Sequence, residues 1–334
     1  MSEKNLIKKA AADFAVAVLA PVSYVPEKTA EYTIDAVNEM AAKGFLKAAD
    51  IEEAAVIAEE FAKQNVSMAE VAVVANVTAD LLAAYGVETE GMTGYAVYEE
   101  GVSCGGVTAT EADGSYTVTG KKIAAALGGA ADQYIVLATL GDVLAAFLVK
   151  AADVTSEKFD KLGLRSYPTA DIIMEAAPAQ LISVDGAKVK AELAAKVDIL
   201  NCFVAAGLAD ACVNASAEYA KTRIQFGMPI GNQPAVKHML ADIEIARFTL
   251  LAVGEKALSC AAAGKPYILE AAAAKKTAED AIFLAANNTV QIHGGVGYSR
   301  DYPIERYYRE AKTLFTNTEK TEYPQESIGD HLLK

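Results

Sequence analysis

The sequence predicts an α+β fold in which a helical domain, a middle antiparallel β domain and a helical bundle follow one another. Residues 3 to about 85, and again from 187 to about 316, repeat apolar side chains at three- and four-residue spacing, as amphipathic helices do. Between them lie short β-branched or alternating runs, separated by Gly, Asp and Pro. We therefore predict domains at residues 1–93, 94–186 and 187–334.

Four helices are expected in the first domain. Asp50 stands directly before the third apolar repeat and is expected to cap that helix. Ser67 and Glu70 have the spacing of a capping box, which predicts that the fourth helix begins at Ser67. Gly44 is expected to end the second helix and Gly86 the fourth. The expected ranges are 5–20, 30–47, 50–66 and 67–86.

The middle domain is predicted from strand-like runs. The clearest are "SYTVTGKKI", "QYIVLATL", "AAFLVK", "DIIMEAA" and "AQLISVDG". Their alternation and β-branched content favour half-buried strands, and an "ADG" turn before the first run favours a hairpin. After them, residues 188–226 form one long helical pattern, and three further helical segments follow.

Composition excludes several classes of function. The chain has 334 residues, is 53% hydrophobic and 22% charged, and carries a net charge of −14. These values are ordinary for a globular protein of two or three domains. A strongly acidic chain does not suit nucleic acid or an anionic membrane, because both attract a basic surface. We also find no uninterrupted apolar run of the roughly 18 residues that a membrane span needs.

The cysteines and histidines predict no metal site. Cys104, Cys202, Cys212 and Cys260 are scattered without a C-x-x-C pair, so we expect reduced thiols and a cytoplasmic location. The histidines have no second ligand at a metal-binding spacing. At the N-terminus, Asp13 interrupts the apolar run after the first lysines, which favours an amphipathic helix over a signal peptide.

Two segments of the C-terminal half identify a family. "AEYAKTRIQFGMPIGNQPAVKHMLADIEIAR" and "AANNTVQIHGGVGYSRDYPIERYYREAK" closely resemble the acyl-CoA dehydrogenase family, which has Y-A-x-x-R-x-Q-F-G-x-P-I and V-Q-I-H-G-G-x-G-Y. Weaker likenesses, such as "GYAVYEEG" and "KLGLRSYPTADIIMEAAPA", extend the resemblance over the whole chain. The chain is shorter than a typical member, mainly after the second helix, between residues 85 and 93, and near Gly101.

The resemblance implies a fold, a cofactor and a reaction. The fold is a helical domain, a β domain and a four-helix bundle, assembled as dimers or tetramers that bind FAD. In such enzymes a Glu removes the α-proton of an acyl-CoA thioester while the β-hydride passes to the flavin. The electrons then leave, usually to an electron-transfer flavoprotein.

One part of the family's FAD site is present here. It grips the AMP and pyrophosphate end of the FAD held by a neighbouring subunit. The resemblance assigns this cofactor-binding role to Arg223, Phe226, Gln291, Gly294 and Gly295. Arg223 suits a forked contact to pyrophosphate, and glycines let the backbone approach a cofactor closely. The alternative is that Gly294 and Gly295 only turn the chain and that Arg223 pairs with a surface acid.

The other part of the site, which holds a subunit's own flavin ring and substrate, is altered throughout. A ring-contacting Thr of the family is Tyr98 here, and a phosphate-contacting Ser is Cys104. The family's W-I-T-N strand reads Ala124–Leu127, its T-R pair reads Thr169-Ala170, and an Arg nine residues before Gly207 has become Asp198.

The catalytic base is also displaced. Counted without gaps, the position of the family's Glu falls on Thr318, and a hydroxyl cannot replace a carboxylate as base without activation. One inserted residue would restore Glu319 to that position. We assign no catalytic residue, and favour the interpretation that Glu319 is an ordinary exposed charge.

This asymmetry leads to three hypotheses. The first is the smaller subunit of a heteromeric α2β2 acyl-CoA dehydrogenase of fatty acid or steroid side-chain metabolism. In it, a homologous catalytic subunit supplies the base, the flavin-ring pocket and the acyl-CoA site, and FAD is shared between the two. The second is a self-sufficient homo-oligomeric dehydrogenase that uses Glu319 as base. The third is a flavin-free scaffold of the same fold.

Overall fold

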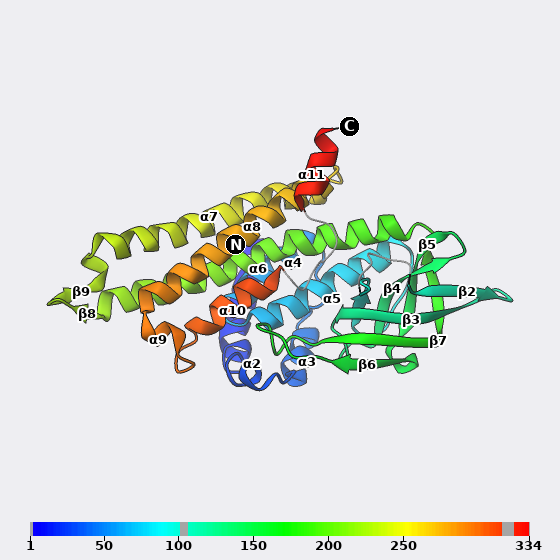
Figure 1. Cartoon of the computed structure of the whole chain (residues 1–334), viewed down its shortest axis with the longest axis horizontal. Helices are drawn as coiled ribbons and strands as arrows, with labels where there is room; N and C mark the ends of the chain where they lie inside the picture. The colour runs from blue at the N-terminus through cyan, green and yellow to red at the C-terminus, as the bar shows by residue number, and fades with distance from the viewer. Residues whose placement is uncertain (1–2, 101–105, 316–323, 334) are drawn as a thin grey trace.

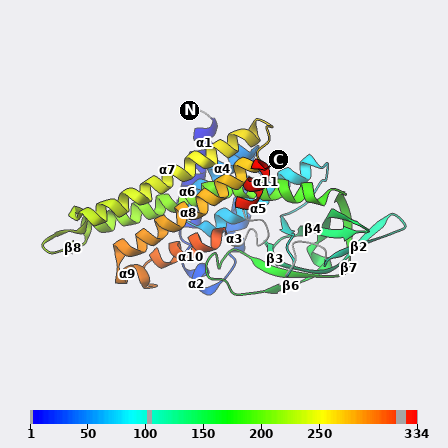
Figure 2. The same ribbon diagram turned by 45° about the horizontal axis from the view of Figure 1, so that its top comes forward.

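The computed structural model describes residues 3–100, 106–315 and 324–333. The N-terminal helices pack beside a β domain, and long helices of the C-terminal half run past both (Figure 1). Figure 2 shows the same order after a 45° turn: the sheet lies at one end and the β8–β9 tip at the other. The predicted fold class, helical, then β, then helical, is confirmed.

The N-terminal region consists mainly of helices. They are α1 (Glu3–Phe14) with a π-helical turn (Ala15–Leu19), α2 (Val25–Thr29), α3 (Ile34–Ala42), α4 (Ile51–Ala62) and α5 (Val66–Ala84). Asp50 caps α4 as predicted, because its carboxylate accepts a hydrogen bond of 2.8 Å from the backbone N–H of Glu53. The predicted start of α5 at Ser67 is wrong: Asn65 is the cap, and its side chain accepts from the N–H of Met68 at 3.1 Å.

The β domain is built on one sheet that closes on itself. Its strands are β1 (Thr93–Ala96), β2 (Thr108–Ala112), β3 (Ser115–Ala126), β4 (Gln133–Leu140), β5 (Val143–Lys150), β6 (Val154–Lys158) and β7 (Thr169–Ser183). Pairings lead from β3 through β2, β4, β5 and β7 back to β3, which forms a ring. Most pairs are antiparallel, as predicted, but β4 runs parallel to both β1 and β2.

The C-terminal region is a bundle of long helices. Its main members are α6 (Gly186–Thr222), α7 (Pro234–Ala262), α8 (Ile268–His293) and α10 (Ile304–Leu314). The short elements are β8 (Ile224–Gln225), β9 (Met228–Pro229), a 3-10 turn (Ile230–Asn232), α9 (Gly295–Tyr298) and α11 (Pro324–Leu332). Helix α6 packs against α7 and α8 in the bundle, and also against α4, α5 and strands β4 and β5. It therefore joins all three regions.

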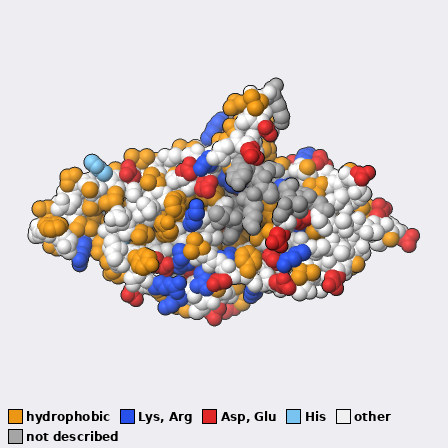
Figure 3. All heavy atoms as spheres, viewed as in Figure 1, with side chains coloured by type: hydrophobic (Ala, Val, Ile, Leu, Met, Phe, Trp, Pro, Cys, Tyr) orange, Lys and Arg blue, Asp and Glu red, His pale blue; other side chains and the backbone are white. Residues whose placement is uncertain are grey.

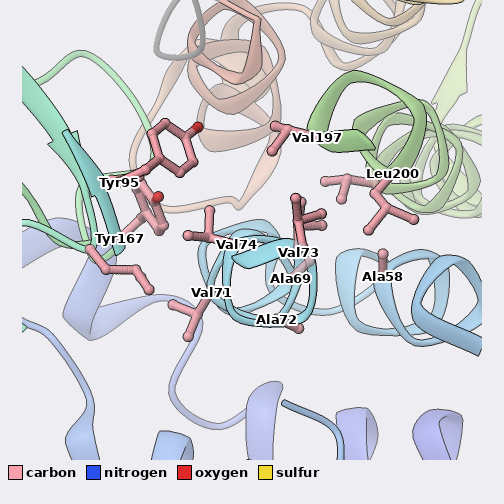
Figure 4. Close-up of a cluster of buried hydrophobic side chains, with 14 of the residues drawn as sticks. Ala58, Ala69, Val71, Ala72, Val73, Val74, Tyr95, Tyr167, Val197 and Leu200 are labelled. Atoms are coloured by element: carbon pink, nitrogen blue, oxygen red, sulfur yellow. The ribbon is translucent and has the colours of Figure 1, made fainter. Parts of the chain in front are cut away.

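The core lies around α5. Val71, Val73 and Val74 of this helix pack with Tyr95 and Tyr167 from the β side, and with α6 on the other side (Figure 4). Helices α5 and α6 are long and apolar enough to cross a membrane, but 83% and 78% of their most apolar windows are buried inside the protein. Their apolar character is accounted for by this packing.

One ionisable side chain of α5 is enclosed in this core. Glu70 is only 3% exposed, and burial raises its pKa to about 8, with a smaller contribution from the charge of Asp198 and an opposing one from Lys161. Burial also lowers the pKa of Lys161 to about 7. Its ammonium donates to the Tyr167 carbonyl at 2.7 Å and to the Thr169 hydroxyl at 2.8 Å.

We predict that Glu70→Gln flattens the pH dependence of stability between about pH 5 and pH 7. Folded Glu70 keeps its proton up to about pH 8, whereas the unfolded chain releases it near 4.5. The natural chain therefore loses stability as the pH rises through this window, by at most about 1.4 kcal/mol per pH unit from this group. Lys161 contributes the opposite slope only above about pH 7. Urea unfolding across the window measures the difference, with exposed Glu218→Gln as control; parallel profiles for the natural chain and Glu70→Gln would refute the assignment.

Candidate cofactor-contact site

The ends of α6 and α8 meet at one end of the bundle. The ring of Tyr219 stacks on His293 with centroids 4.4 Å apart, and Ser216 hydrogen-bonds to Thr289 at 3.3 Å. Nδ1 of His293 lies 2.8 Å from the carbonyl of Thr289, and burial lowers the pKa of this histidine. The imidazole is therefore neutral near pH 7 and can donate from Nδ1. This contact brings the region after residue 222 beside the region after residue 293.

Arg223 is the residue that ends α6 at this point. Its backbone N–H bonds to the carbonyl of Tyr219 at 2.9 Å, and its carbonyl accepts from Ile230 at 2.9 Å, so its backbone is fixed on both sides. Its side chain is exposed, and within the described residues its guanidinium has no hydrogen bond or ion pair. Among the described residues, no surface acid pairs with Arg223, contrary to the alternative above. The forked donors of its guanidinium remain available to an external anion.

Phe226 is held outward by a strained turn. Strands β8 and β9 pair Gln225 with Met228, and the two residues between them, Phe226 and Gly227, have φ of 52° and 77°. Such values are those of a type I′ hairpin turn, in which Asn-Gly is the preferred pair. Phenylalanine in this conformation is costly, and the residue is 90% exposed, so it gains little from packing against the described residues. The geometry suits a ring that contacts something outside this chain.

Gln291, Gly294 and Gly295 lie at the end of α8. All three are exposed, and a Cβ added at either glycine would meet nothing within 4 Å. Gly294 has φ 60° and ψ −136°, a conformation that is almost confined to glycine. The backbone turn therefore requires glycine at position 294, which agrees with the alternative that these glycines only turn the chain. The same turn also leaves backbone atoms open to a ligand.

The altered positions come together at a different place. The carbonyl of Tyr98 accepts a hydrogen bond of 2.9 Å from Ile123, directly before Ala124–Leu127, and Ala125 and Ala126 pair with Ala170 and Thr169. Tyr98 and Asp198 line the same seam between β1 and α6. Residues that are far apart in sequence are thus gathered at one location, as a shared ring site requires. Cys104, Thr318 and Glu319 lie outside the described residues.

Asp198 has an internal partner that the sequence analysis missed. Its carboxylate lies 3.3 Å from the ammonium of Lys275 on α8, and both side chains are less than a tenth exposed. A buried acid needs such a cation, because an uncompensated charge in the interior is strongly unfavourable. The Arg-to-Asp reversal is therefore accompanied by a lysine that neutralises it.

The sequence and the fold of this chain are similar to those of known proteins. The sequence profile described as "Acyl-CoA dehydrogenase, C-terminal domain" matches residues 186–317. An acyl-CoA dehydrogenase of Bacillus subtilis (strain 168) is 29% identical, over 99% of this chain and 98% of that protein. Butyryl-CoA dehydrogenase from Megasphaera elsdenii superposes with a TM-score of 0.93 at 25% identity, covering 100% of this chain and 99% of that structure. The chain belongs to the acyl-CoA dehydrogenase family.

Not every acyl-CoA dehydrogenase relative aligns along its whole length. The short-chain specific acyl-CoA dehydrogenase of Megasphaera elsdenii is 33% identical over 214 residues, which are 60% of this chain and only 56% of that relative. Here, then, the matched part spans about half the relative. The alignment with the Bacillus protein extends over 379 positions, against the 334 residues of this chain, so this member of the family is shortened.

FAD, the cofactor of the family, fits one of the two places and not the other. The open guanidinium of Arg223, the exposed ring of Phe226 and the bare Gly294–Gly295 backbone suit its pyrophosphate and adenosine parts. The seam at Tyr98 does not suit its ring, because it holds a cavity of only about 10 Å³. Small-molecule sites usually offer about 300–1,000 Å³.

Two larger cavities lie elsewhere, and neither contains the altered positions. One of about 690 Å³ opens beside Glu88–Gly91 and the ends of β5 and β7. The other, about 490 Å³, lies between α3, α5 and β1. In the described part of the chain we find no cluster of His, Cys, Asp and Glu able to hold a metal ion. Burial raises the pKa of the Cys202 and Cys212 thiols, so neither is a ready nucleophile.

We predict that Lys275→Met destabilises the chain by about 3–5 kcal/mol, because the buried carboxylate of Asp198 loses its ion pair with Lys275. Lys276→Met, at the neighbouring and more exposed lysine that pairs with Asp280, is the matched control and should cost less than about 1 kcal/mol. The double variant Asp198→Leu/Lys275→Met should recover most of the loss. Chemical denaturation measures all three, and equal costs for the two single variants would show that the buried pair has no special role.

We predict that Phe226→Asn affects the stability of the chain and its contact with flavin in opposite directions. Asparagine tolerates the left-handed φ that strains phenylalanine, so the isolated chain should keep its stability or gain up to about 1 kcal/mol. Flavin retention by an assembled complex should fall, because the exposed ring is removed. Thermal melting and flavin content report the two effects. A variant that melts lower and retains flavin fully would contradict this account of Phe226.

Proposed function

We propose that this chain is the non-catalytic subunit of a heteromeric, FAD-dependent acyl-CoA dehydrogenase. A homologous subunit would carry the base, the flavin-ring pocket and the acyl-CoA site. This chain would complete that subunit's FAD site with Arg223, Phe226, Gln291, Gly294 and Gly295. The observation that carries the proposal is the contrast between these open, outward-facing groups and the closed seam at Tyr98.

Each contributed group has a defined task in this proposal. The guanidinium of Arg223 supplies positive charge and two parallel donors to the pyrophosphate. The ring of Phe226 offers an apolar face to the adenosine end, and the Gly294–Gly295 backbone lets the nucleotide pass close to the helix end. FAD bound in the partner's site would supply the hydride acceptor. The chain's own residues bind and orient the cofactor's tail and take no part in proton transfer.

The surface around these groups supports an assembly. Ile224 and Met228 are exposed on the hairpin that carries Phe226, and Tyr298 and Tyr302 are exposed at the end of α9 and just after it. Ile245, Phe248 and Leu284 are exposed on α7 and α8. Figure 3 shows hydrophobic side chains gathered over this end and along the adjoining helices. Large apolar residues exposed in groups are typical of protein–protein contacts. A same-fold partner in an α2β2 assembly would cover them.

The remaining parts of the reaction are proposed by family likeness. The acyl-CoA thioester would bind in the partner, and an electron-transfer flavoprotein would take up the electrons. The acyl group would come from fatty acid or steroid side-chain metabolism, in the cytoplasm. None of these assignments depends on the described residues of this chain.

A second candidate is a self-sufficient dehydrogenase with Glu319 as base. It is favoured by relatives from Megasphaera elsdenii and Bacillus subtilis, whose names describe acyl-CoA dehydrogenases. It requires an isoalloxazine ring within this chain, which the closed seam opposes. The flavin content of the chain purified alone separates the two: near zero for the subunit, and near one per chain for the self-sufficient enzyme, with activity lost in Glu319→Gln.

We predict that Arg223→Ala lowers FAD retention of the heteromeric complex at least about tenfold, because a charge-assisted contact of roughly 1.5–3 kcal/mol is lost. The chain is co-expressed with a same-fold subunit that has the W-I-T and Y-E-G-T sequences, and flavin released on heating is measured by absorbance. Lys221→Ala is the matched control, since Lys221 is an exposed cation two residues away that pairs with Glu218. Equal flavin retention in both variants would overturn the proposed role of this end of the bundle.

A further inference from the structure

The seam between β1 and α6 is closed by particular side chains. The ring of Tyr98 is 6% exposed, and Lys190 of α6, at 7%, places its ammonium 5.8 Å from the ring centroid. This distance is within the range of a cation–π contact. Tyr95, Val97, Leu193, Val197 and Asp198 line the same space, and only about 10 Å³ remains open. The closure therefore includes one aromatic ring with a cation above it.

Tyr98 is fixed in this position by its neighbours along the chain. Its carbonyl is bonded to the N–H of Ile123, and the next residue, Glu99, forms an ion pair of 2.5 Å with Lys122. Lys122 is fully buried, and Glu99 is 6% exposed. A buried pair with such close geometry holds the segment firmly, because separating two opposite charges in the interior is strongly unfavourable. The backbone of Tyr98 is therefore anchored on both sides, by the bond to Ile123 and by the neighbouring ion pair.

The closure occupies the place where the resemblance puts the flavin ring. Tyr98 replaces a residue that contacts the ring in the family, and Ala124–Leu127, which replaces the strand along the ring, begins directly beside it. Ala124 and Leu127 have left-handed φ values of 50° and 57°, although neither is glycine. The strand thus has an unusual backbone, with a bulge between Lys122 and Ala125, and presents small or aliphatic side chains.

We propose that Tyr98 and Lys190 form an internal plug that takes the place of the isoalloxazine ring. The inference rests on the proposed function and deepens it. A planar aromatic group occupies the site of a planar cofactor, and the chain folds around its own side chain where relatives fold around a ligand. Tyr98 is then the residue that excludes flavin from this chain and reserves it for the partner's site.

The test reopens the seam and offers it a flavin. The double variant Tyr98→Thr/Lys190→Ala returns the family's threonine and removes the cation. Tyr116→Thr/Lys188→Ala is the matched control, because Tyr116 packs on Phe147 within the sheet and Lys188 is exposed. Thermal melting of each full-length chain is followed with and without saturating riboflavin. Riboflavin carries the ring but no pyrophosphate or adenosine, so it does not report on Arg223, Phe226 or the glycine turn.

We expect three results if Tyr98 and Lys190 form a plug. Riboflavin leaves the melting temperature of the natural chain unchanged. The Tyr98→Thr/Lys190→Ala variant melts lower, and riboflavin restores at least half of the loss. The control variant also melts lower, and riboflavin restores none of it. A merely structural tyrosine would give no rescue, so a destabilised variant that ignores riboflavin overturns the plug, and so does a natural chain that riboflavin stabilises.

A variant too unstable to purify still decides the question. Its soluble yield is then compared between cultures with and without added riboflavin: a yield that rises several-fold supports the plug, and an unchanged yield contradicts it. Failure of the plug leaves the Arg223→Ala experiment untouched. Conversely, loss of the Arg223 effect would remove the proposed subunit role without changing the response of the seam to riboflavin.

Discussion

The close contact between α6 and α4 is the constraint on which the rest of the structure depends. A Cβ at Gly207 would lie 2.2 Å from the carbonyl oxygen of Glu59, so only glycine allows α6 to approach α4 at this distance. This contact fixes the position of α6, a helix of 37 residues and about 55 Å in length. The β domain lies at its start, and the β8–β9 hairpin lies beyond its end. The seam at Asp198 and the tip at Arg223 are therefore held by one rigid element, yet lie several helical turns apart. Side chains at one end can change without moving those at the other.

Local signals allowed most elements to be predicted, and long-range pairing accounts for what was missed. Asp50 is predictable as a cap because the signal lies within four residues, whereas the capping-box spacing of Ser67 and Glu70 points two residues past the actual cap, Asn65. Strand β6 is mostly polar and exposed at the edge of the sheet, so it has no apolar alternation to reveal it. The parallel pairing of β4 with β1 and β2 depends on how the ring closes, and no local pattern contains that information.

The site shows the same division between local and distant information. Sequence placed Asp198 at an altered position but could not supply its partner, because Lys275 is on another helix. A signal was present: Lys275 interrupts a buried stripe formed by Ala271, Ala274 and Ala278, and a lysine in such a stripe needs a counter-charge. The exposed guanidinium of Arg223, unpaired among the residues that the structure describes, and the strained turn at Phe226 are properties of conformation, which a residue pattern alone does not give.

The plug stabilises the chain, whereas the strained β8–β9 hairpin destabilises it. Together these features suit a subunit that folds before it meets its partner. A chain that binds its ring cofactor gains stability only when the cofactor is present, since binding to the folded state adds to its free energy of unfolding. Filling the seam with Tyr98 and Lys190 removes that dependence, so the chain can fold first. The tip does the reverse: Phe226 holds a costly left-handed backbone with its ring in solvent, and recovers that cost only when something covers the ring. The plug thus stabilises the interior without a bound cofactor. The Phe226 turn lowers stability at the surface, where this chain would contact a neighbour's cofactor.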